Sequence, residues 1–548
     1  MSTVRTEQVL FEPRRAVYPE ALVMSIREAV LWTTLAVLVF AGVAIHFGAI
    51  DCNDGYQYVS IAENISTTGQ VATSLVHFDT ERAHAEIPAP ETWLPPGYSA
   101  VIYLVSRLGP GRELAAEIVS VLGAVLVALF LCRLCPVIGC SVNATRFPVF
   151  LWIASSYAAA YSRTLASESL FTAAVTAAIL LLLVSDQSLR RHDAVPTTLI
   201  SAFVLSGLSS WIRYAGYFIF CGFLLYALLL LFMNVKRKIV VYASLLAGGS
   251  IIAALLLRNI VLTSSWQGSN TTPFSSPVLE TASISVRAFI KLIFGDDART
   301  HIWLPIIGGC TVILLSAAAL LNARRRLPAS RPLYILMSLL CVYCALMFFA
   351  GLHTPISFGS RMFFPVLPLI LALMSWFFVW AGQSVSFAGN KRQIAVLSIS
   401  VFTVSYVITN IRSQFAALPP SPAATVRQQL AQPDDQGMPL GDWIDSHLDS
   451  RTTIVAAEGQ ATGYVLHRPT VSLVEHRFSM VNWTEAQVRQ TMTVFHAQYL
   501  LVFPGAGPSD APSEYESQFL SSLVKRQYPD WLQIAESNPE VIVYQKIR

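Results

Sequence analysis

The sequence predicts a polytopic α-helical membrane protein with a small extracytoplasmic α/β domain at its C-terminal end. Hydrophobic residues make up 54% of the chain and charged residues 13%, whereas soluble domains carry about 25% charged residues. Eleven apolar runs approach the roughly 20 residues that a membrane-spanning helix needs, and the composition changes near residue 412. The net charge of +4 lies in the loops between the runs, so it indicates membrane topology and no nucleic-acid partner.

The apolar runs justify the predicted helices in order. Residues 1–28 are polar and are expected to form a cytoplasmic N-terminal segment, and residues 29–411 the transmembrane domain. The first run is interpreted as a retained helix, because no small-residue cleavage site follows it. The predicted spans lie near residues 29–50, 113–132, 147–162, 167–185, 197–212, 215–233, 239–257, 302–321, 333–350, 362–382 and 393–411.

Basic clusters predict the orientation of these spans. Four clusters fall on the same side as the N-terminus, and cytoplasmic loops carry the excess of Lys and Arg. The N-terminus is therefore expected in the cytoplasm of a multi-pass plasma (inner) membrane protein, with residues 51–98 and the C-terminal segment outside. The clusters are Arg190-Arg191, Lys236-Arg237-Lys238, Arg324-Arg325-Arg326 and Lys391-Arg392.

Residues 412–548 are expected to form a small extracytoplasmic domain. Its first part contains the Pro-rich linker Leu418-Pro419-Pro420-Ser421-Pro422. Strands that alternate with helices predict an α/β fold. The predicted strands lie near residues 453–456, 470–474, 499–503 and 541–544, and the predicted helices near 438–449, 484–497 and 513–526.

The segment 51–98 is the longest polar stretch between the early spans. It is the expected catalytic loop. It carries one Arg82 against a set of acids, and a polar loop beside a membrane is a preferred place for chemistry. Asp54 lies just beyond the first span and faces outward, although Asp51 and Asp54 could equally cap a helix that starts at Tyr56. The acids are Asp51, Asp54, Glu63, Asp79, Glu81, Glu86 and Glu91.

Four arginines map to the outer face, against the positive-inside tendency. Cations near a membrane usually have an anionic partner. Any one of them could pair with a protein carboxylate or reach the lipid head groups, but four on one leaflet favour an anion site. They are Arg163, Arg213, Arg258, which precedes Asn259, and Arg361.

A metal site in the acidic loop is the weaker interpretation. Its candidate ligands match no closed zinc spacing. A solvated acidic loop is therefore favoured over a metal site. The candidates are His77, Asp79, Glu81, His84 and Glu86.

Several short motifs, in this order and topology, are similar to those of one family. They are Asp54, Tyr58, Ala62, Asn64 and Gly69, then Pro95-Pro96-Gly97-Tyr98, Ser167-Glu168-Ser169-Leu170-Phe171, Arg258-Asn259 and Ser360-Arg361-Met362-Phe363-Phe364-Pro365. Through them, most of residues 29–411 resembles the polyprenyl-phosphate-sugar-dependent glycosyltransferases of the GT-C fold, the group of the protein O-mannosyltransferases and the lipid A aminoarabinose transferase. Gly55 stands where relatives often have Glu.

The resemblance implies inverting transfer of a sugar from a polyprenyl-phosphate donor to a lipid, glycan or protein acceptor on the extracytoplasmic face. It implies Asp54 as the catalytic carboxylate, with Glu168 as a second acid, while Asp51 remains an alternative base. Arg258 and Arg361 are implied contacts of the lipid phosphate, which needs no strong acid in order to leave. The family varies in its dependence on a divalent metal ion, and no other cofactor is expected.

Other substrate contacts are expected from the same segments. Tyr58 could stack on a sugar ring or belong to the aromatic belt at the membrane edge. Arg163, Arg213 and Asn259 are further candidates for binding the substrate, from their place on the outer face.

Two functions from other classes stay open on the sequence. A transporter or flippase could use the arginines for anionic lipid head groups, and a membrane sensor could bind a ligand with its C-terminal domain. Neither needs the ordered acid, Tyr and Pro-Pro-Gly pattern of residues 51–98, so the enzyme is preferred.

Overall fold

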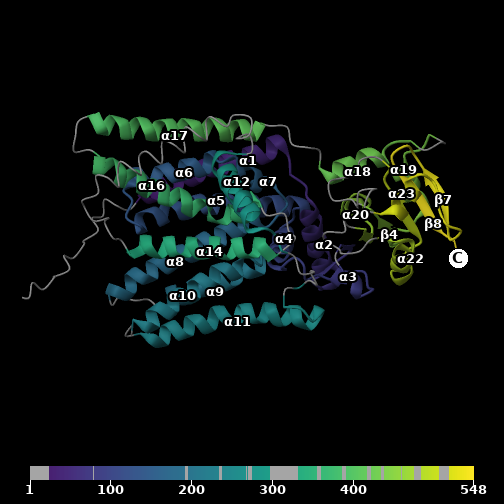
Figure 1. Ribbon diagram of the computed structural model, residues 1–548, viewed down its shortest axis with the longest axis horizontal. Coiled ribbons are helices and arrows are strands. Elements are labelled where there is room, and N and C mark those ends of the chain that lie inside the picture. The colour runs from purple at the N-terminus through teal and green to yellow at the C-terminus, as the bar shows by residue number, and fades with distance from the viewer. Residues whose placement is uncertain are drawn as a thin grey trace, which may run out of the picture.

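The computed structural model places a bundle of helices on one side and a mixed α/β domain on the other, with helices α2 (Asn53–Thr68) and α3 (Asp79–Ala83) between them (Figure 1). It describes residues 24–77, 79–191, 196–233, 237–266, 268, 275–295, 331–353, 359–385, 390–415, 421–433, 437–457, 459–473, 483–504 and 517–547. The predicted span near 302–321 and the cluster Arg324-Arg325-Arg326 lie outside these residues.

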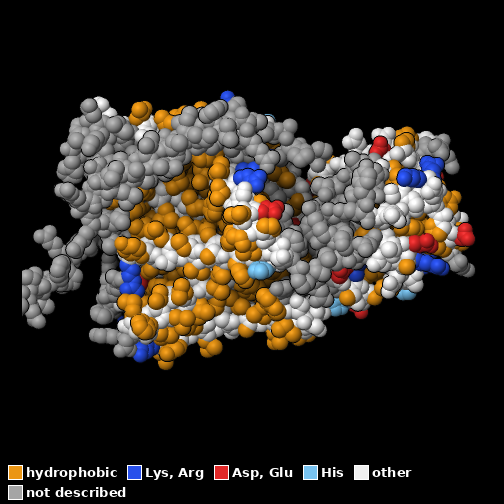
Figure 2. Space-filling model, viewed as in Figure 1, with side chains coloured by type: hydrophobic (Ala, Val, Ile, Leu, Met, Phe, Trp, Pro, Cys, Tyr) orange, Lys and Arg blue, Asp and Glu red, His pale blue; other side chains and the backbone are white. Residues whose placement is uncertain are grey.

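Long apolar helices form the bundle. Seven stretches of the described residues are long and apolar enough to cross a membrane. They lie in α1 (Ile26–Phe47), α5 (Arg112–Val137), α8 (Glu168–Arg191), α11 (Lys238–Thr263), α14 (Arg331–His353), the run of α15 (Ser360–Phe363), η3 (Phe364–Val366) and α16 (Leu367–Val385), and α17 (Asn390–Phe415). Shorter helices of the bundle include α9 (Pro196–Ile212), α10 (Gly216–Phe232) and α12 (Val278–Phe294). The chain is a multi-pass membrane protein, and apolar side chains cover the bundle on the face shown in Figure 2.

The predicted span near 147–162 is instead two helices, α6 (Val142–Ala154) and α7 (Ser156–Arg163). Ser155 between them has extended backbone angles, and its side chain accepts a hydrogen bond from the Ala158 N–H. A serine that satisfies a free N–H of the next helix starts that helix. The single continuous helix expected here was wrong for this reason, because hydropathy does not register a cap.

Residues 51–98 fold into ordered structure. Strands β1 (Ala72–Thr73) and β3 (Ala89–Pro90) pair antiparallel, and α4 (Gly97–Ser106) follows. Glu81 and Glu91 are buried. The prediction of a solvated loop was wrong, because polar groups of α2 fasten the segment: Asn64 Nδ2 donates to the Ala72 carbonyl at 3.0 Å.

The C-terminal domain contains a six-stranded sheet in the order β2-β5-β4-β6-β8-β7. Strands β4 (Ile454–Ala456), β5 (Thr470–Ser472) and β6 (Tyr499–Val502) run parallel, and β7 (Leu532–Ser537) and β8 (Ile542–Lys546) pair antiparallel. Among its described residues, the helices of this domain are α18 (Pro422–Leu430), α19 (Leu440–His447), α20 (Gly459–Leu466), α22 (Glu485–Val494) and α23 (Gln518–Val524). The predicted small α/β sheet is confirmed.

One edge strand of this sheet comes from the other end of the chain. β2 (Leu75–Val76) pairs parallel with β5, with Leu75 opposite Thr470 and Val76 opposite Val471. The segment 51–98 is thus built into the C-terminal sheet as well as onto the helical bundle.

Candidate active site

Four charged side chains from four parts of the chain meet at the end of the bundle that faces the C-terminal domain. Arg361 of α15 donates from Nη2 to Oδ2 of Asp54 in α2 and from Nε to Oε1 of Glu168 in α8. Arg213, between α9 and α10, donates from Nη1 to the same Glu168 oxygen at 2.6 Å. We call these residues the Asp54 cluster. Two guanidinium groups and two carboxylates make it neutral.

Helix starts place three members of the cluster. Asp54 is the second residue of α2, Glu168 the first of α8 and Arg361 the second of α15. The positive end of the helix dipole stabilises an acid in the first turn and disfavours a cation there. Arg361 lies in the four-residue helix α15, where two carboxylates compensate its charge.

The N-terminus of α2 has no side-chain cap. The helix begins at Asn53, and its N-cap residue Cys52 makes no side-chain hydrogen bond to it. The alternative in which Asp51 and Asp54 cap a helix starting at Tyr56 is therefore wrong, and the Asp54 carboxylate is available to Arg361.

Gly55 allows α2 to approach the turn before Glu168. A Cβ at position 55 would lie 2.7 Å from the Leu165 carbonyl oxygen, a distance that side chains do not tolerate. The glycine that stands where relatives often have Glu is thus required by backbone packing. One turn further along, the Tyr58 hydroxyl hydrogen-bonds to Ser167 Oγ at 3.0 Å, which also accepts from Arg213.

The cluster is closed around Glu168 and open at Asp54. The exposed fraction of the side chain is 0% for Glu168, 15% for Arg213, 28% for Asp54 and 37% for Arg361. Burial would raise the pKa of Asp54, but the charge and hydrogen bond of Arg361, with the charge of Arg213, hold that pKa below its ordinary value. Asp54 is therefore an ionised carboxylate at the accessible side of the cluster.

Arg258 and Asn259 form a separate contact between α11 and the segment 51–98. Arg258 Nη2 donates to the Glu91 carbonyl at 2.5 Å, and Asn259 Nδ2 donates to the Tyr214 hydroxyl at 3.0 Å. Tyr214 directly follows Arg213, so this contact lies next to the cluster along the chain. The Arg258 guanidinium itself is bound to main chain.

Two predicted site residues point elsewhere. Arg163 Nη1 lies 3.3 Å from the carbonyl oxygens of Phe47 and Gly48, and its guanidinium stacks over the Phe47 ring. Asp51 Oδ2 accepts from Ser421 Oγ at 3.2 Å and so faces the C-terminal domain. Of the two alternative bases, Asp54 is the one beside the arginines.

Tyr58 is buried and belongs to neither of the two expected arrangements. Its ring packs edge to face against the Tyr98 ring, with the centroids 4.8 Å apart, and its hydroxyl hydrogen-bonds to Ser167. Through Ser167 the side chain contacts the Asp54 cluster indirectly. Ser167 itself was not predicted as a site residue, although it stands directly before Glu168 in the quoted motif.

Three of the five residues proposed as metal ligands make contacts within the segment. Asp79 pairs with Arg82 at 2.5 Å, and the His77 N–H donates to Glu81 Oε2 at 2.5 Å. Across the described ranges, no three side chains of His, Cys, Asp or Glu lie close enough to hold a metal ion. In the Asp54 cluster both carboxylates are paired with guanidinium groups.

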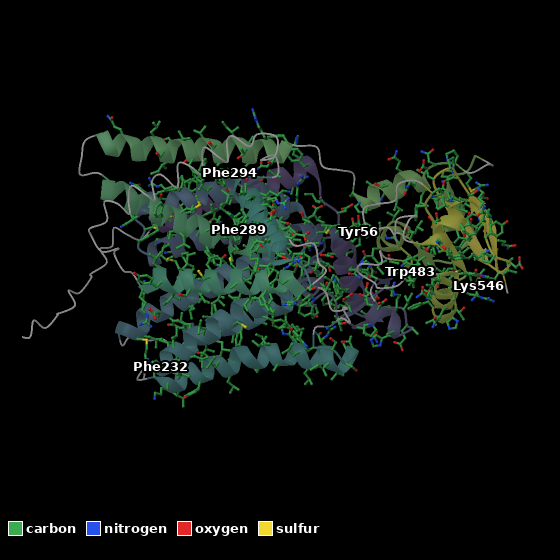
Figure 3. The ribbon with its side chains drawn as sticks, viewed as in Figure 1. Tyr56, Phe232, Phe289, Phe294, Trp483 and Lys546 are labelled. Carbon is green, nitrogen blue, oxygen red and sulfur yellow. The ribbon has the colours of Figure 1, made fainter. Side chains whose placement is uncertain are left out.

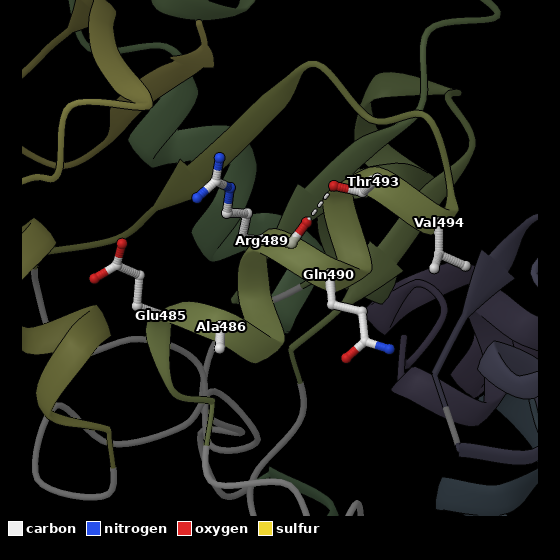
Figure 4. A pocket seen from close by; sticks show the side chains of 6 residues that line it. All are labelled: Glu485, Ala486, Arg489, Gln490, Thr493 and Val494. Carbon is white, nitrogen blue, oxygen red and sulfur yellow. Dashed lines mark hydrogen bonds between the residues drawn. The ribbon is translucent and has the colours of Figure 1, made fainter. Parts of the chain in front are cut away.

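An open depression on the C-terminal domain is not a second candidate. Its six lining residues all belong to the helix α22 (Figure 4). Two of them contact Trp531, which directly precedes β7: Glu485 accepts from Trp531 Nε1 at 2.7 Å, and Arg489 lies over the Trp531 ring. The depression is the surface of one helix.

Comparisons with solved structures place the fold. ArnT from Cupriavidus metallidurans, bound to undecaprenyl phosphate, is similar with a TM-score of 0.57 and 12% identity, over 96% of this chain and 99% of that chain. AglB, the archaeal oligosaccharyltransferase of Archaeoglobus fulgidus, in complex with an inhibitory peptide and a dolichol-phosphate, is similar with a TM-score of 0.54 and 10% identity, over 87% and 69%. The Archaeoglobus fulgidus oligosaccharyltransferase in complex with Zn and sulfate has a TM-score of 0.55 and 12% identity, over 86% and 68%.

No family model and no curated protein matches the chain. At this level of identity the structural likenesses concern the fold. The predicted GT-C fold is confirmed: the chain has the fold of these membrane glycosyltransferases over most of its length.

Proposed function

We propose that the chain is an integral membrane glycosyltransferase that transfers a sugar, with inversion, from a polyprenyl-phosphate donor to an acceptor. The observation that carries this proposal is the contact of Arg361 with Asp54 in a chain of this fold. Two proteins of the same fold were solved with undecaprenyl phosphate or a dolichol-phosphate, which supports a lipid phosphate as the group that Arg361 meets.

In the proposed reaction Asp54 is the general base. It accepts a proton from a hydroxyl or amine of the acceptor, whose oxygen or nitrogen forms the new bond to the anomeric carbon of the donor. The bond from that carbon to the phosphate oxygen breaks, and the phosphate leaves with the electron pair. Attack from the face opposite to the phosphate inverts the anomeric centre, and one carboxylate is sufficient.

Arg361 has two tasks in this proposal. Its guanidinium can bind two phosphate oxygens side by side, and it contacts Asp54 when no phosphate competes. Burial raises the pKa of Asp54, and the contact with Arg361 lowers it. When Arg361 turns to the donor phosphate, the lowering weakens, so the pKa of Asp54 rises and the carboxylate becomes a stronger base.

Glu168 and the remaining cations hold this arrangement in place. Glu168 keeps Arg213 as a partner at 2.6 Å when Arg361 moves, so its buried charge stays compensated. Arg258 is proposed as a second phosphate contact, which requires it to exchange the Glu91 carbonyl for the donor.

We also propose that the N-terminus lies in the cytoplasm and that the Asp54 cluster and the C-terminal domain lie outside the plasma (inner) membrane. The four basic clusters support this orientation, because positive loops remain cytoplasmic. The acceptor is then a lipid, glycan or protein of the cell envelope.

The test compares Asp54→Asn with Asp51→Asn in cells that lack the native chain. Mass spectrometry of lipid-linked and surface glycans should show a sugar that depends on the chain, lost in Asp54→Asn and kept in Asp51→Asn at equal protein abundance. The control is matched, since both acids lie in the same segment but only Asp54 contacts Arg361. If Asp54→Asn makes the product at the wild-type level, Asp54 is not the base. If the wild-type chain exchanges lipid across the membrane and makes no new glycan, the transporter is favoured.

A further inference from the structure

Helix α2 belongs to two hydrophobic cores at once. Tyr58 packs with Tyr98 in the core at the end of the helical bundle. Tyr56 and Val59 pack in the core of the C-terminal domain. Asp54 stands on this same helix, so the two halves of the molecule hold it jointly.

Tyr56 makes the direct contact with the C-terminal domain. Its buried ring stacks on Tyr464 of α20, with centroids 4.4 Å apart and an interplanar angle of 29°. Its hydroxyl oxygen accepts a hydrogen bond from the Ala423 N–H at 3.0 Å. Because the first N–H groups of a helix lack partners within it, this hydroxyl completes the start of α18. Figure 3 shows Tyr56 between the bundle and the C-terminal domain.

A second connection runs through the edge strand. Gln57 Nε2 donates to the Leu75 carbonyl at 3.3 Å, and the Ser74 N–H donates to Ser60 Oγ at 2.9 Å. Leu75 belongs to β2, which pairs with β5 of the C-terminal sheet. Polar groups one turn apart on α2 are therefore attached to that sheet.

These contacts determine where Asp54 points. Residues two positions apart on a helix are rotated by about 200° from each other, so Asp54 and Tyr56 face opposite ways. One meets Arg361 and the other meets Tyr464. A rotation or shift of α2 at Tyr56 consequently moves the Asp54 carboxylate relative to Arg361.

We propose that the C-terminal domain positions the base, with Tyr56 and Tyr464 as positioning residues. The inference rests on the proposed role of Asp54. It goes beyond a domain that only binds the acceptor, because it makes the domain necessary for the chemical step itself. Loss of the Tyr56–Tyr464 contact then lowers the rate at saturating substrates and leaves the donor concentration for half-maximal rate unchanged.

The experiment uses the full chain in detergent or vesicles. Total lipid-linked sugars from the host's membranes serve as donor, and membranes of a strain without the chain supply the acceptor. The release of polyprenyl phosphate is measured as both are varied. Tyr464→Ala should lower the saturating rate by about 10- to 100-fold, because small misplacements of a catalytic group have effects of this size. Tyr464→Phe keeps the stacked ring and should restore most of the rate.

Tyr56→Phe and Tyr544→Phe form the matched pair. Each removes one buried hydroxyl that bonds to main chain, Tyr56 to Ala423 and Tyr544 to the Leu523 carbonyl at 2.5 Å. Tyr544 lies on β8, in a core without α2. Tyr56→Phe should lower the saturating rate, whereas Tyr544→Phe should change only the thermal stability. Should Tyr464→Ala fail to fold, this pair decides.

Two outcomes overturn the inference. In the first, Tyr464→Ala changes only the acceptor concentration for half-maximal rate. In the second, Tyr56→Phe loses no more rate than Tyr544→Phe. Both leave Asp54 as the base if Asp54→Asn is inactive, whereas an active Asp54→Asn removes the proposed function first.

Discussion

Arg361 contacts Asp54 across 307 residues of sequence. The same guanidinium also contacts the buried Glu168, so it connects the start of α2 to the start of α8. Because Arg361 contacts both acids, it holds both helices in place. It can break its contact with the more exposed Asp54 and keep its contact with the buried Glu168. The properties of the site depend on this difference between the two carboxylates.

Replacing Arg361 should separate its charge from its geometry. Arg361→Gln is expected to lower the rate by about 100- to 1000-fold, the loss that follows removal of one donor to a developing anion. Arg361→Lys keeps the charge but cannot contact two groups side by side, so it should recover only part of the rate. Binding of polyprenyl phosphate and the saturating rate are measured for each variant. A wild-type rate in Arg361→Gln would remove Arg361 from the reaction.

Glu168→Gln should destabilise the protein. Glu168 is buried and accepts from both Arg361 and Arg213, and breaking a buried ion pair from one side costs about 3 to 5 kcal/mol. Removing Arg213 as well leaves less uncompensated charge, so Glu168→Gln with Arg213→Leu should melt higher than Glu168→Gln alone. The melting temperatures in detergent provide the measurement. Equal stability of Glu168→Gln and wild type would contradict the ion-pair network.

Gly55→Ala should lower activity without touching a charge. The added Cβ would lie 2.7 Å from the Leu165 carbonyl oxygen, so α2 must shift, at about 1 to 3 kcal/mol of stability. Gly42→Ala in α1 is the control, since a Cβ there meets nothing within 4 Å. Melting temperature and sugar transfer are compared for the two variants. If Gly55→Ala matches Gly42→Ala in both, the close approach of α2 is not required.

The Asp54–Arg361 pair should stabilise the fold at neutral pH and stop doing so at acidic pH. The pKa of Asp54 is lowered in the folded protein, so the pair stabilises above the ordinary pKa of about 4. This stabilisation is lost as the pH falls through the lowered pKa. The melting temperature of wild type should exceed that of Asp54→Asn near neutral pH, and the difference should shrink below pH about 4. A difference that grows on acidification would contradict the ion pair.

The sequence could predict the acids and arginines of the site but not their pairing. Asp54, Glu168 and Arg361 stand in short motifs at the ends of apolar runs, which hydropathy locates. Their contacts depend on how separate helix starts meet in space, and no local pattern carries that information. Arg163 and Arg258 had the same local character and proved to bind main-chain carbonyls.

Short elements were the other part that sequence could not predict. β2 has two residues, too few for the alternation that identifies a strand. The break at Ser155 depends on a side-chain cap at the start of α7, which hydropathy does not record. Strands β4, β5, β6 and β8 of the C-terminal domain were predicted, because each lies in a short β-like run, whereas the six-residue β7 (Leu532–Ser537) was missed.

The edge strand from residues 51–98 also governs how the chain can be divided. Arg82 donates to the Ser472 carbonyl at 2.8 Å across 390 residues, and β2 completes its ladder only when β5 has been synthesised. A C-terminal fragment expressed alone would present β5 as a bare edge with unpaired N–H and C=O groups, which invites self-association. Soluble fragments for crystallisation or ligand screening should therefore carry β2 grafted ahead of β5, or be made with the whole chain.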